Sequence, residues 1–117
     1  MDENVARRLT AALGVKLSWR PVAREHTTGR YFPRLNTIAL RVGVNPTGRT
    51  HALLHELAHA LCGHGWHNDE WESIAVRLWR EHGLTAAWVA EREEFYGNPL
   101  RQWLQEQPYQ PSASATP

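Results

Sequence analysis

The 117-residue sequence predicts one small α+β domain, in which a small antiparallel or mixed sheet packs on a central helix and further helices follow. Two periodicities lead to this fold class. In two segments of the first half of the chain, apolar and polar residues alternate, as they do in strands with one buried face. In the central and C-terminal segments, apolar residues recur every three or four positions, as they do in helices that pack on a core.

A short helix and a strand are expected first. Residues 3–13 have apolar side chains at helical spacing, and Gly14 follows as a stop signal. Residues 15–20 alternate between apolar and polar types, which predicts a strand, and Pro21 limits its extension. Residues 21–35 are rich in turn-forming and polar types, so we interpret them as a loop or a broken edge strand.

The strongest alternation in the chain covers residues 37–44 and predicts a strand directly before the central helix. Asn45 or Thr47 can cap that helix, and Pro46 suits its first position. Gly63 can end the helix by adopting a left-handed conformation. Both ends of the central helix are therefore marked by local signals.

Further helices are expected in the second half of the chain. They cover residues 70–82, residues 86–96 and a short segment that begins at Asn98. The tail over residues 108–117 is rich in Pro, Ser and Ala and is expected to be disordered. We therefore expect a single domain over residues 1–107, followed by a disordered tail.

The central helix contains the most specific chemical signal, the H-E-x-x-H pattern of His55, Glu56 and His59. Residues four apart on a helix project from the same face, so the two histidines form a pair of metal ligands. Glu56 lies beside that face, where its carboxylate can reach a metal-bound water without coordinating the metal. The pattern favours a catalytic zinc ion, Zn²⁺.

A catalytic zinc needs a third protein ligand and one open position. We expect His67, because it lies eight residues after the second histidine, at the entry of the next helix. His64 follows the helix end directly and has less reach, but it can polarise a substrate carbonyl. Glu70 or Glu72 would be the third ligand if the site had two histidines and one carboxylate. His51 lies too far along the helix to share one ion with the pair.

Two parts of the sequence resemble SprT-like zinc metallopeptidases. Residues 53–61 resemble their active-site helix, and residues 67–71 resemble the following H-x-x-x-aromatic element, which carries the third zinc ligand. The short gap between the second and third histidines is similar to the related WLM peptidases. This resemblance covers residues 36–82 and implies a minimal zincin fold, with substrates that include proteins crosslinked to DNA.

The same resemblance implies the roles of individual residues. His55, His59 and His67 would hold zinc, and Glu56 would be the catalytic base. A second resemblance, to ImmA/IrrE-like peptidases, rests on the H-E-x-x-H pattern followed by Glu72-x-x-Ala on a helix, and it implies an acidic third ligand.

Composition bounds the cellular setting and the partners. No apolar run has the length of a membrane span, and the polar start lacks the features of a signal peptide, so we expect a cytoplasmic protein. The single cysteine, Cys62, excludes an internal disulfide and a zinc cage made of cysteines. Residues 1–50 carry nine Lys/Arg against three Asp/Glu, and residues 51–117 carry four against nine. The basic half is a possible DNA contact, although a solvated surface is the preferred interpretation.

These observations predict a monomeric, zinc-dependent metallopeptidase that acts on a protein or peptide. Glu56 would accept a proton from zinc-bound water as that water attacks a peptide carbonyl. The substrate is expected to lie along an unpaired edge of the strand at 37–44. The alternatives are an ImmA/IrrE-like regulatory peptidase, a non-catalytic zinc-binding module that associates with DNA, and a hydrolase of a non-peptide bond.

Overall fold

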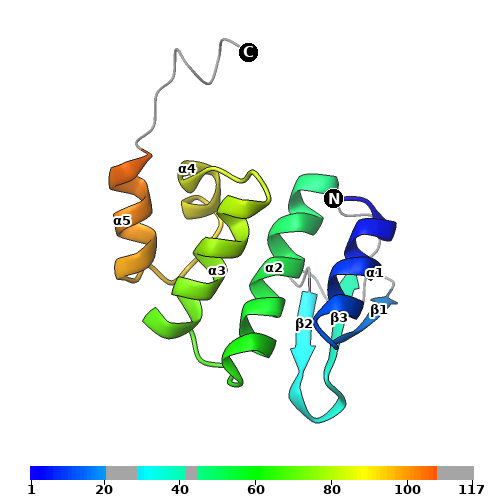
Figure 1. The fold of residues 1–117 in the computed structure, drawn as a ribbon. Helices are drawn as coiled ribbons and strands as arrows, with labels where there is room; N and C mark the ends of the chain where they lie inside the picture. The colour runs from blue at the N-terminus through cyan, green and yellow to red at the C-terminus, as the bar shows by residue number, and fades with distance from the viewer. Residues whose placement is uncertain (21–28, 42–44, 108–117) are drawn as a thin grey trace.

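One long central helix separates the two halves of the fold (Figure 1). A three-stranded mixed sheet and the N-terminal helix lie on one side of it, and the C-terminal helices lie on the other. The computed structural model describes residues 1–20, 29–41 and 45–107. The expected tail over residues 108–117 therefore lies outside the described residues. The small α+β class expected from the sequence is confirmed.

The chain begins with helix α1, Glu3–Ala12, and strand β1, Lys16–Arg20. The side chain of Asp2 caps α1 by accepting a hydrogen bond from the backbone N–H of Val5 at 2.8 Å. Gly14 has a φ of 73°, a conformation that favours glycine, and it turns the chain from the helix into the strand. Both predicted elements are confirmed.

The sheet has the strand order β1-β3-β2, so β3, Thr37–Arg41, is the central strand. It runs parallel to β1 and antiparallel to β2, Gly29–Phe32. A short 3-10 helix, Pro33–Leu35, joins β2 to β3. Of the loop and the broken edge strand expected over residues 21–35, β2 confirms an edge strand in the described part, and residues 21–28 lie outside the described residues. The predicted continuation of the strand at 37–44 through residues 42–44 also lies outside them.

Helix α2, Pro46–Cys62, lies between the sheet and the C-terminal helices (Figure 1). Its start and end follow the predicted signals: the side chain of Asn45 accepts a hydrogen bond from the Gly48 N–H at 2.8 Å, and Gly63 has a φ of 83°. One face of α2 is buried in the core. The apolar residues of this face are Ala52, Leu53, Leu54, Leu57 and Ala58.

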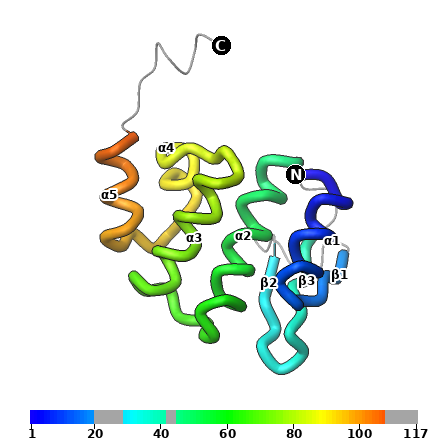
Figure 2. The backbone as a smooth tube through the Cα atoms, viewed as in Figure 1, coloured from blue at the N-terminus to red at the C-terminus, as the bar shows by residue number. Residues whose placement is uncertain are grey.

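Three helices follow: α3, Asp69–Glu81; α4, Ala86–Ala90; and α5, Asn98–Glu106 (Figure 2). The predicted helix over residues 86–96 is therefore wrong in its second half, because α4 ends at Ala90. The segment from 91 to 97 instead crosses toward α2, where its side chains contact residues that are distant in the sequence. These tertiary contacts outweigh the local helix preference of its glutamates.

Three of the six tryptophans, Trp71, Trp79 and Trp103, are almost fully buried and pack in the core. Trp71 and Trp79 of α3 reach α2, where their Nε1 atoms donate to the backbone carbonyls of His55 and His51. Trp66 differs, because it is 74% exposed in the turn between α2 and α3. Among the described helices, none combines the length and the apolar character that crossing a bilayer requires.

Candidate active site

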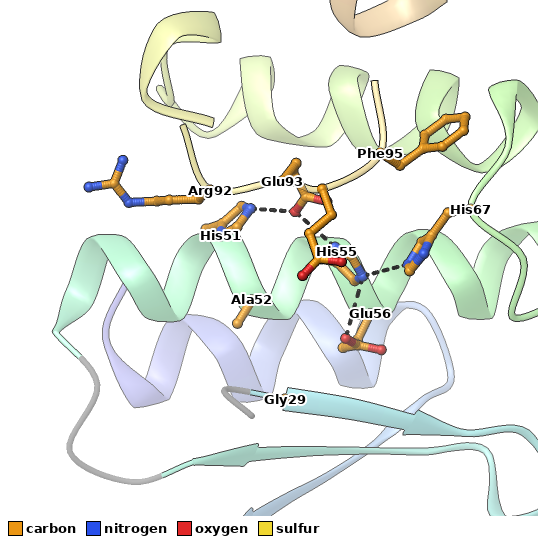
Figure 3. Close-up of a pocket in the computed structure, with 10 residues that line it drawn as sticks. Gly29, His51, Ala52, His55, Glu56, His67, Arg92, Glu93 and Phe95 are labelled. Atoms are coloured by element: carbon orange, nitrogen blue, oxygen red, sulfur yellow. Dashed lines mark hydrogen bonds and ion pairs between the residues drawn. The ribbon is translucent and has the colours of Figure 1, made fainter. Parts of the chain in front are cut away.

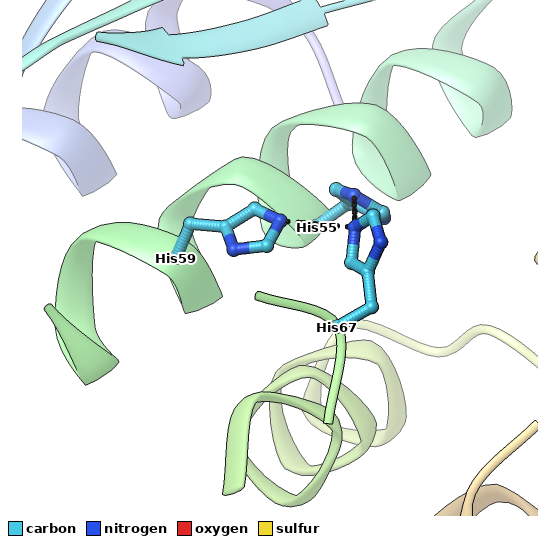
Figure 4. Close-up of side chains that lie close together, drawn as sticks. All are labelled: His55, His59 and His67. Atoms are coloured by element: carbon cyan, nitrogen blue, oxygen red, sulfur yellow. Dashed lines mark hydrogen bonds between the residues drawn. The ribbon is translucent and has the colours of Figure 1, made fainter. Parts of the chain in front are cut away.

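Three histidines converge beside α2 (Figure 4). His55 and His59 come from successive turns of the helix, and His67 returns from the turn that follows it. The Nε2 atom of His67 lies 3.1 Å from Nε2 of His55 and 3.2 Å from Nε2 of His59. A tetrahedral zinc ion with Zn–N bonds of about 2.0–2.1 Å separates its ligand nitrogens by about 3.3 Å. The spacing of the three nitrogens therefore fits one metal ion.

The other ring nitrogens of the two helical histidines are held by acceptors. His59 Nδ1 donates to the backbone carbonyl of His64 at 3.1 Å, and His55 Nδ1 donates to Glu93 Oε2 at 2.9 Å. These bonds place the proton on Nδ1 and leave the Nε2 lone pairs directed at the cluster. The left-handed turn at Gly63 puts the His64 carbonyl in position.

Glu93 is the residue of this site that the sequence did not reveal. It comes from the segment after α4, and its side chain is only 6% exposed (Figure 3). Burial by itself would raise its pKa, but the hydrogen bonds from His51 and His55 outweigh burial and lower the pKa to about 2. Glu93 is therefore an ionised acceptor behind His55. In the sequence it looks like one more charge in the run 91–94, which is typical of the solvent face of a helix.

His51 supports this carboxylate rather than joining the cluster. Its Nε2 donates to Glu93 Oε2 at 2.6 Å, one helical turn before His55. The ring packs against Trp79 and Trp88, with centroid distances of 5.4 Å to each. The expectation that His51 is not one of the converging histidines agrees with this geometry.

Glu56 lies on the opposite side of the cluster, toward the sheet (Figure 3). Its Oε1 accepts a hydrogen bond from the backbone N–H of Tyr31 in β2 at 2.9 Å, and its Oε2 is 3.8 Å from His55 Nε2. Burial raises the pKa of Glu56 to about 7, against the opposing effects of His55 and the Tyr31 N–H. A carboxylate with a pKa near neutrality can both accept and release a proton at neutral pH.

The protonation of two of the three histidines, His59 and His67, also suits metal binding. Burial lowers the pKa of His59 to about 4, and burial together with the nearby His55 lowers the pKa of His67. Both rings are therefore neutral at pH 7, which is the form that binds metals. Burial alone would lower the pKa of His55, but its hydrogen bond and ion pair with Glu93 raise it.

The other candidates for the third ligand point elsewhere. His64 Nε2 lies 2.7 Å from Glu70 Oε1, and Glu70 is exposed. Glu72 is buried and accepts hydrogen bonds from the backbone N–H groups of Gly97 at 3.2 Å and Leu100 at 2.8 Å, so it caps the start of α5. Within the described residues, none of these three side chains belongs to the histidine cluster. The assignment of His67 as a metal ligand remains a prediction.

A cavity of about 340 Å³ opens beside the cluster, between β2 and the segment after α4. Its lining includes both carboxylates described above and Gly29 of β2. The lining residues are Gly29, His51, Ala52, His55, Glu56, His67, Arg92, Glu93, Glu94 and Phe95 (Figure 3). The exposed Trp66 is not among them.

The structure corrects the predicted position of the substrate strand. The strand expected over 37–44 forms the central β3, which is paired with β1 on one side and with β2 on the other over residues 37–40, so it has no free edge there. Strand β2 borders the cavity instead, and the N–H of Tyr31 points away from β3 toward Glu56. A pattern of apolar residues predicts a strand, but not which other strands pair with it.

Glu93→Gln is expected to weaken zinc binding by about 10- to 100-fold, because the neutral amide holds the His55 ring less firmly than a carboxylate does. The measurement is the zinc dissociation constant, obtained by competition with a chromophoric chelator. Glu94→Gln is the matched control, because it removes a carboxylate from the next position in the same cavity lining. Equal affinities for the two variants would contradict the role assigned to Glu93.

Two comparisons with known proteins found a match, one to a family and one to a fold. The family model for the IrrE N-terminal-like domain, peptidase family M78, matches residues 10–102. The crystal structure of the metallopeptidase zymogen of Pyrococcus abyssi abylysin is similar in fold, with a TM-score of 0.51 and 19% sequence identity over 91% of this chain and 90% of that chain. No curated protein matches the chain at a significant level.

The family match supports the ImmA/IrrE-like resemblance seen in the sequence, whereas the resemblance to SprT-like and WLM peptidases is not confirmed. The structural likeness at 19% identity shows the fold alone. Because the family model covers most of the sequence, the chain belongs to the peptidase M78 family of IrrE N-terminal-like domains.

Proposed function

We propose that this protein is a zinc-dependent peptidase in which His55, His59 and His67 bind the metal and Glu56 is the general base. One observation carries the proposal: one ring nitrogen from each of the three histidines lies within 4.8 Å of the others, and the Glu56 carboxylate lies 3.8 Å from His55 Nε2. Membership of a peptidase family supports a metallopeptidase type of function.

The donor set suits zinc. Three imidazoles, two of them held through Nδ1, form a common arrangement for a catalytic zinc with one open position. When bound there, zinc acts as a Lewis acid that polarises a carbonyl and makes water more acidic. A purely structural zinc site would need a fourth protein ligand, and within the described residues the cluster consists of these three histidines.

The residues around the cluster would transfer the proton and orient the metal ligands. Glu56 is placed to accept a proton from the attacking water, and with a pKa of about 7 it can release that proton to the departing amine. Glu93 and the His64 carbonyl keep the two helical imidazoles in their ligating orientation. The two carboxylates thus have different tasks, which follow from their different partners.

The substrate would bind as an extra strand beside β2. In the antiparallel register Tyr31 lies opposite Ile38, and the outward-facing Tyr31 N–H reaches Glu56. Alternate residues of an edge strand direct their N–H and C=O groups outward, so Gly29 presents its groups on the same side as Tyr31. A peptide that pairs with this edge would cross the cavity next to the histidines.

The family match favours an ImmA/IrrE-like regulatory peptidase as the more specific form of this function. Such an enzyme would cut one or a few protein targets rather than proteins in general. DNA association through the basic N-terminal half is part of the same proposal, because the exposed Arg7 and Arg8 of α1 belong to that half.

The direct test is to incubate the protein with a denatured protein pool and to identify new N-termini by mass spectrometry. Zinc-loaded wild type is expected to produce them, a chelator to abolish them, and added zinc to restore them. His55→Ala, prepared in parallel, reports contaminating proteases. Parallel samples with and without DNA measure any stimulation.

A zinc-loaded wild type that cuts neither the pool nor folded candidate proteins would contradict the proposal and favour the non-catalytic zinc-binding module. New N-termini that persist equally with chelator and in His55→Ala would also contradict it, because the cutting would then not depend on the histidine cluster.

A further inference from the structure

A second cavity adjoins the first at the N-terminal end of α2. It has a volume of about 620 Å³ and shares two lining residues, His51 and Arg92, with the cavity beside the histidine cluster. Figure 3 shows Arg92 beyond His51, at the far end of the row formed by His67, His55 and His51 along α2. Among the described residues, the lining consists of Asn45, Pro46, Thr47, Gly48, His51, Trp88 and Arg92.

Arg92 is held in place at the junction of the two cavities. Its guanidinium carbon lies 3.8 Å from the centroid of the Trp88 ring, and its Nη1 donates to the Trp88 carbonyl at 2.8 Å. Trp88 in turn packs edge-on against His51, with a centroid distance of 5.4 Å. A guanidinium fixed by stacking loses little conformational freedom when it binds a ligand.

The two cavities differ in charge. The first contains three glutamates, Glu56, Glu93 and Glu94, whereas the described lining of the second has no acidic residue. Among the described residues that line either cavity, Arg92 is the only arginine or lysine. Its one charged contact within the described part of the chain is Glu91 at 3.5 Å, a surface pair made through Nη1. The other guanidinium nitrogens remain for a ligand.

We infer that the second cavity is a substrate subsite in which Arg92 binds a carboxylate group of the peptide, an inference that rests on the proposed peptidase function. His51 lies four residues, about 6 Å along the helix axis, before His55, and Arg92 lies beyond it (Figure 3). At about 3.3 Å per extended residue, the carboxylate lies at least about two residues from the bond that is cut. Acidic residues disfavour a carboxylate in the first cavity, so the charges also orient the chain.

The carboxylate has two possible sources, an Asp or Glu side chain and the C-terminus of a short peptide. Paired fluorescent peptides distinguish them: one pair has Glu or Gln at a scanned position, and another has a free or amidated C-terminus. Two measurements are made on each pair, kcat/KM with the zinc-loaded wild type and the dissociation constant with zinc-loaded Glu56→Gln.

The wild type is expected to prefer the carboxylate-bearing peptide of one pair by about five- to tenfold, the size of one favourable partly exposed charge pair. Arg92→Gln should lose this preference, and Arg92→Glu should invert it in favour of a peptide with Lys at the same position. Arg101→Gln, an exposed change in α5 outside both cavities, should keep the wild-type preference.

An equal preference in wild type and Arg92→Gln, or none in the wild type, would overturn the inference. The two proposals fail in different ways. Cleavage without a carboxylate preference contradicts the subsite and leaves the peptidase function intact. A carboxylate preference in binding without any cleavage supports the subsite and contradicts the peptidase function.

Discussion

Replacing His67 by alanine is expected to remove high-affinity zinc binding, whereas replacing His64 by alanine leaves it in place. His67 Nε2 lies 3.1 and 3.2 Å from the Nε2 atoms of the two helical histidines, but His64 Nε2 is directed to Glu70 at 2.7 Å. Loss of a ligand should weaken binding by more than the 10- to 100-fold that follows from loss of a residue that only orients one. Chelator competition and metal analysis after dialysis measure the difference.

The two variants are well matched, because both histidines belong to the short turn between α2 and α3. His64→Ala also retains the backbone carbonyl that accepts the hydrogen bond from His59 Nδ1. Thermal unfolding of both metal-free variants should therefore be similar. If His64→Ala lost zinc and His67→Ala retained it, the third ligand would have to be reassigned to His64.

The helix that carries the site was predictable because its determinants are local. Asn45 and Gly63 mark its ends, and the structure shows them in the capping roles that their residue types favour. The convergence of His55 and His59 follows from helix geometry alone. His67 was within reach of the same reasoning, since a short turn limits where the chain can go after the helix.

Pairing in the sheet was less accessible from the sequence. Strand β3 was expected to have a free edge, but Ile38, Ala39 and Leu40 are all buried, and β3 is paired on both sides. A continuous apolar run such as Ile-Ala-Leu is typical of a central strand, so this run was the feature of the sequence that indicated a strand paired on both sides. The identity of the edge strand β2 depended on pairing between segments, which alternation does not encode.

Glu93 shows the same limit at the site itself. Its position 38 residues after His55 carries no motif, and its buried ion pair exists only because the chain leaves the helix after Ala90. Trp71 shows what a motif can encode: its ring stacks on His59 at 5.1 Å and its Nε1 donates to the His55 carbonyl at 3.1 Å. These two contacts with the histidines of α2 explain why an aromatic residue stands four positions after His67.

Replacing Glu56 by glutamine is expected to lower kcat for peptide hydrolysis by about 100- to 10,000-fold, the range attributed to general acid–base catalysis, while zinc binding changes little. Glutamine has nearly the same shape as glutamate. Its amide oxygen can accept the hydrogen bond that Glu56 Oε1 accepts from the Tyr31 N–H at 2.9 Å in the wild type. Glutamine has no basic oxygen that can take a proton from water. Single-turnover cleavage and zinc titration of the same preparation separate the two effects.

Glu70→Gln provides the control, because it removes an exposed carboxylate that pairs with His64 outside the histidine cluster. Its kcat should stay within a few fold of the wild type. Full activity in Glu56→Gln would show that another group takes the proton. Glu93 would be a poor replacement, because hydrogen bonds from His51 and His55 lower its pKa to about 2, despite the opposing effect of burial. A carboxylate so weakly basic accepts protons poorly at neutral pH, so Glu56 is the carboxylate of this site that is suited to the proton transfer.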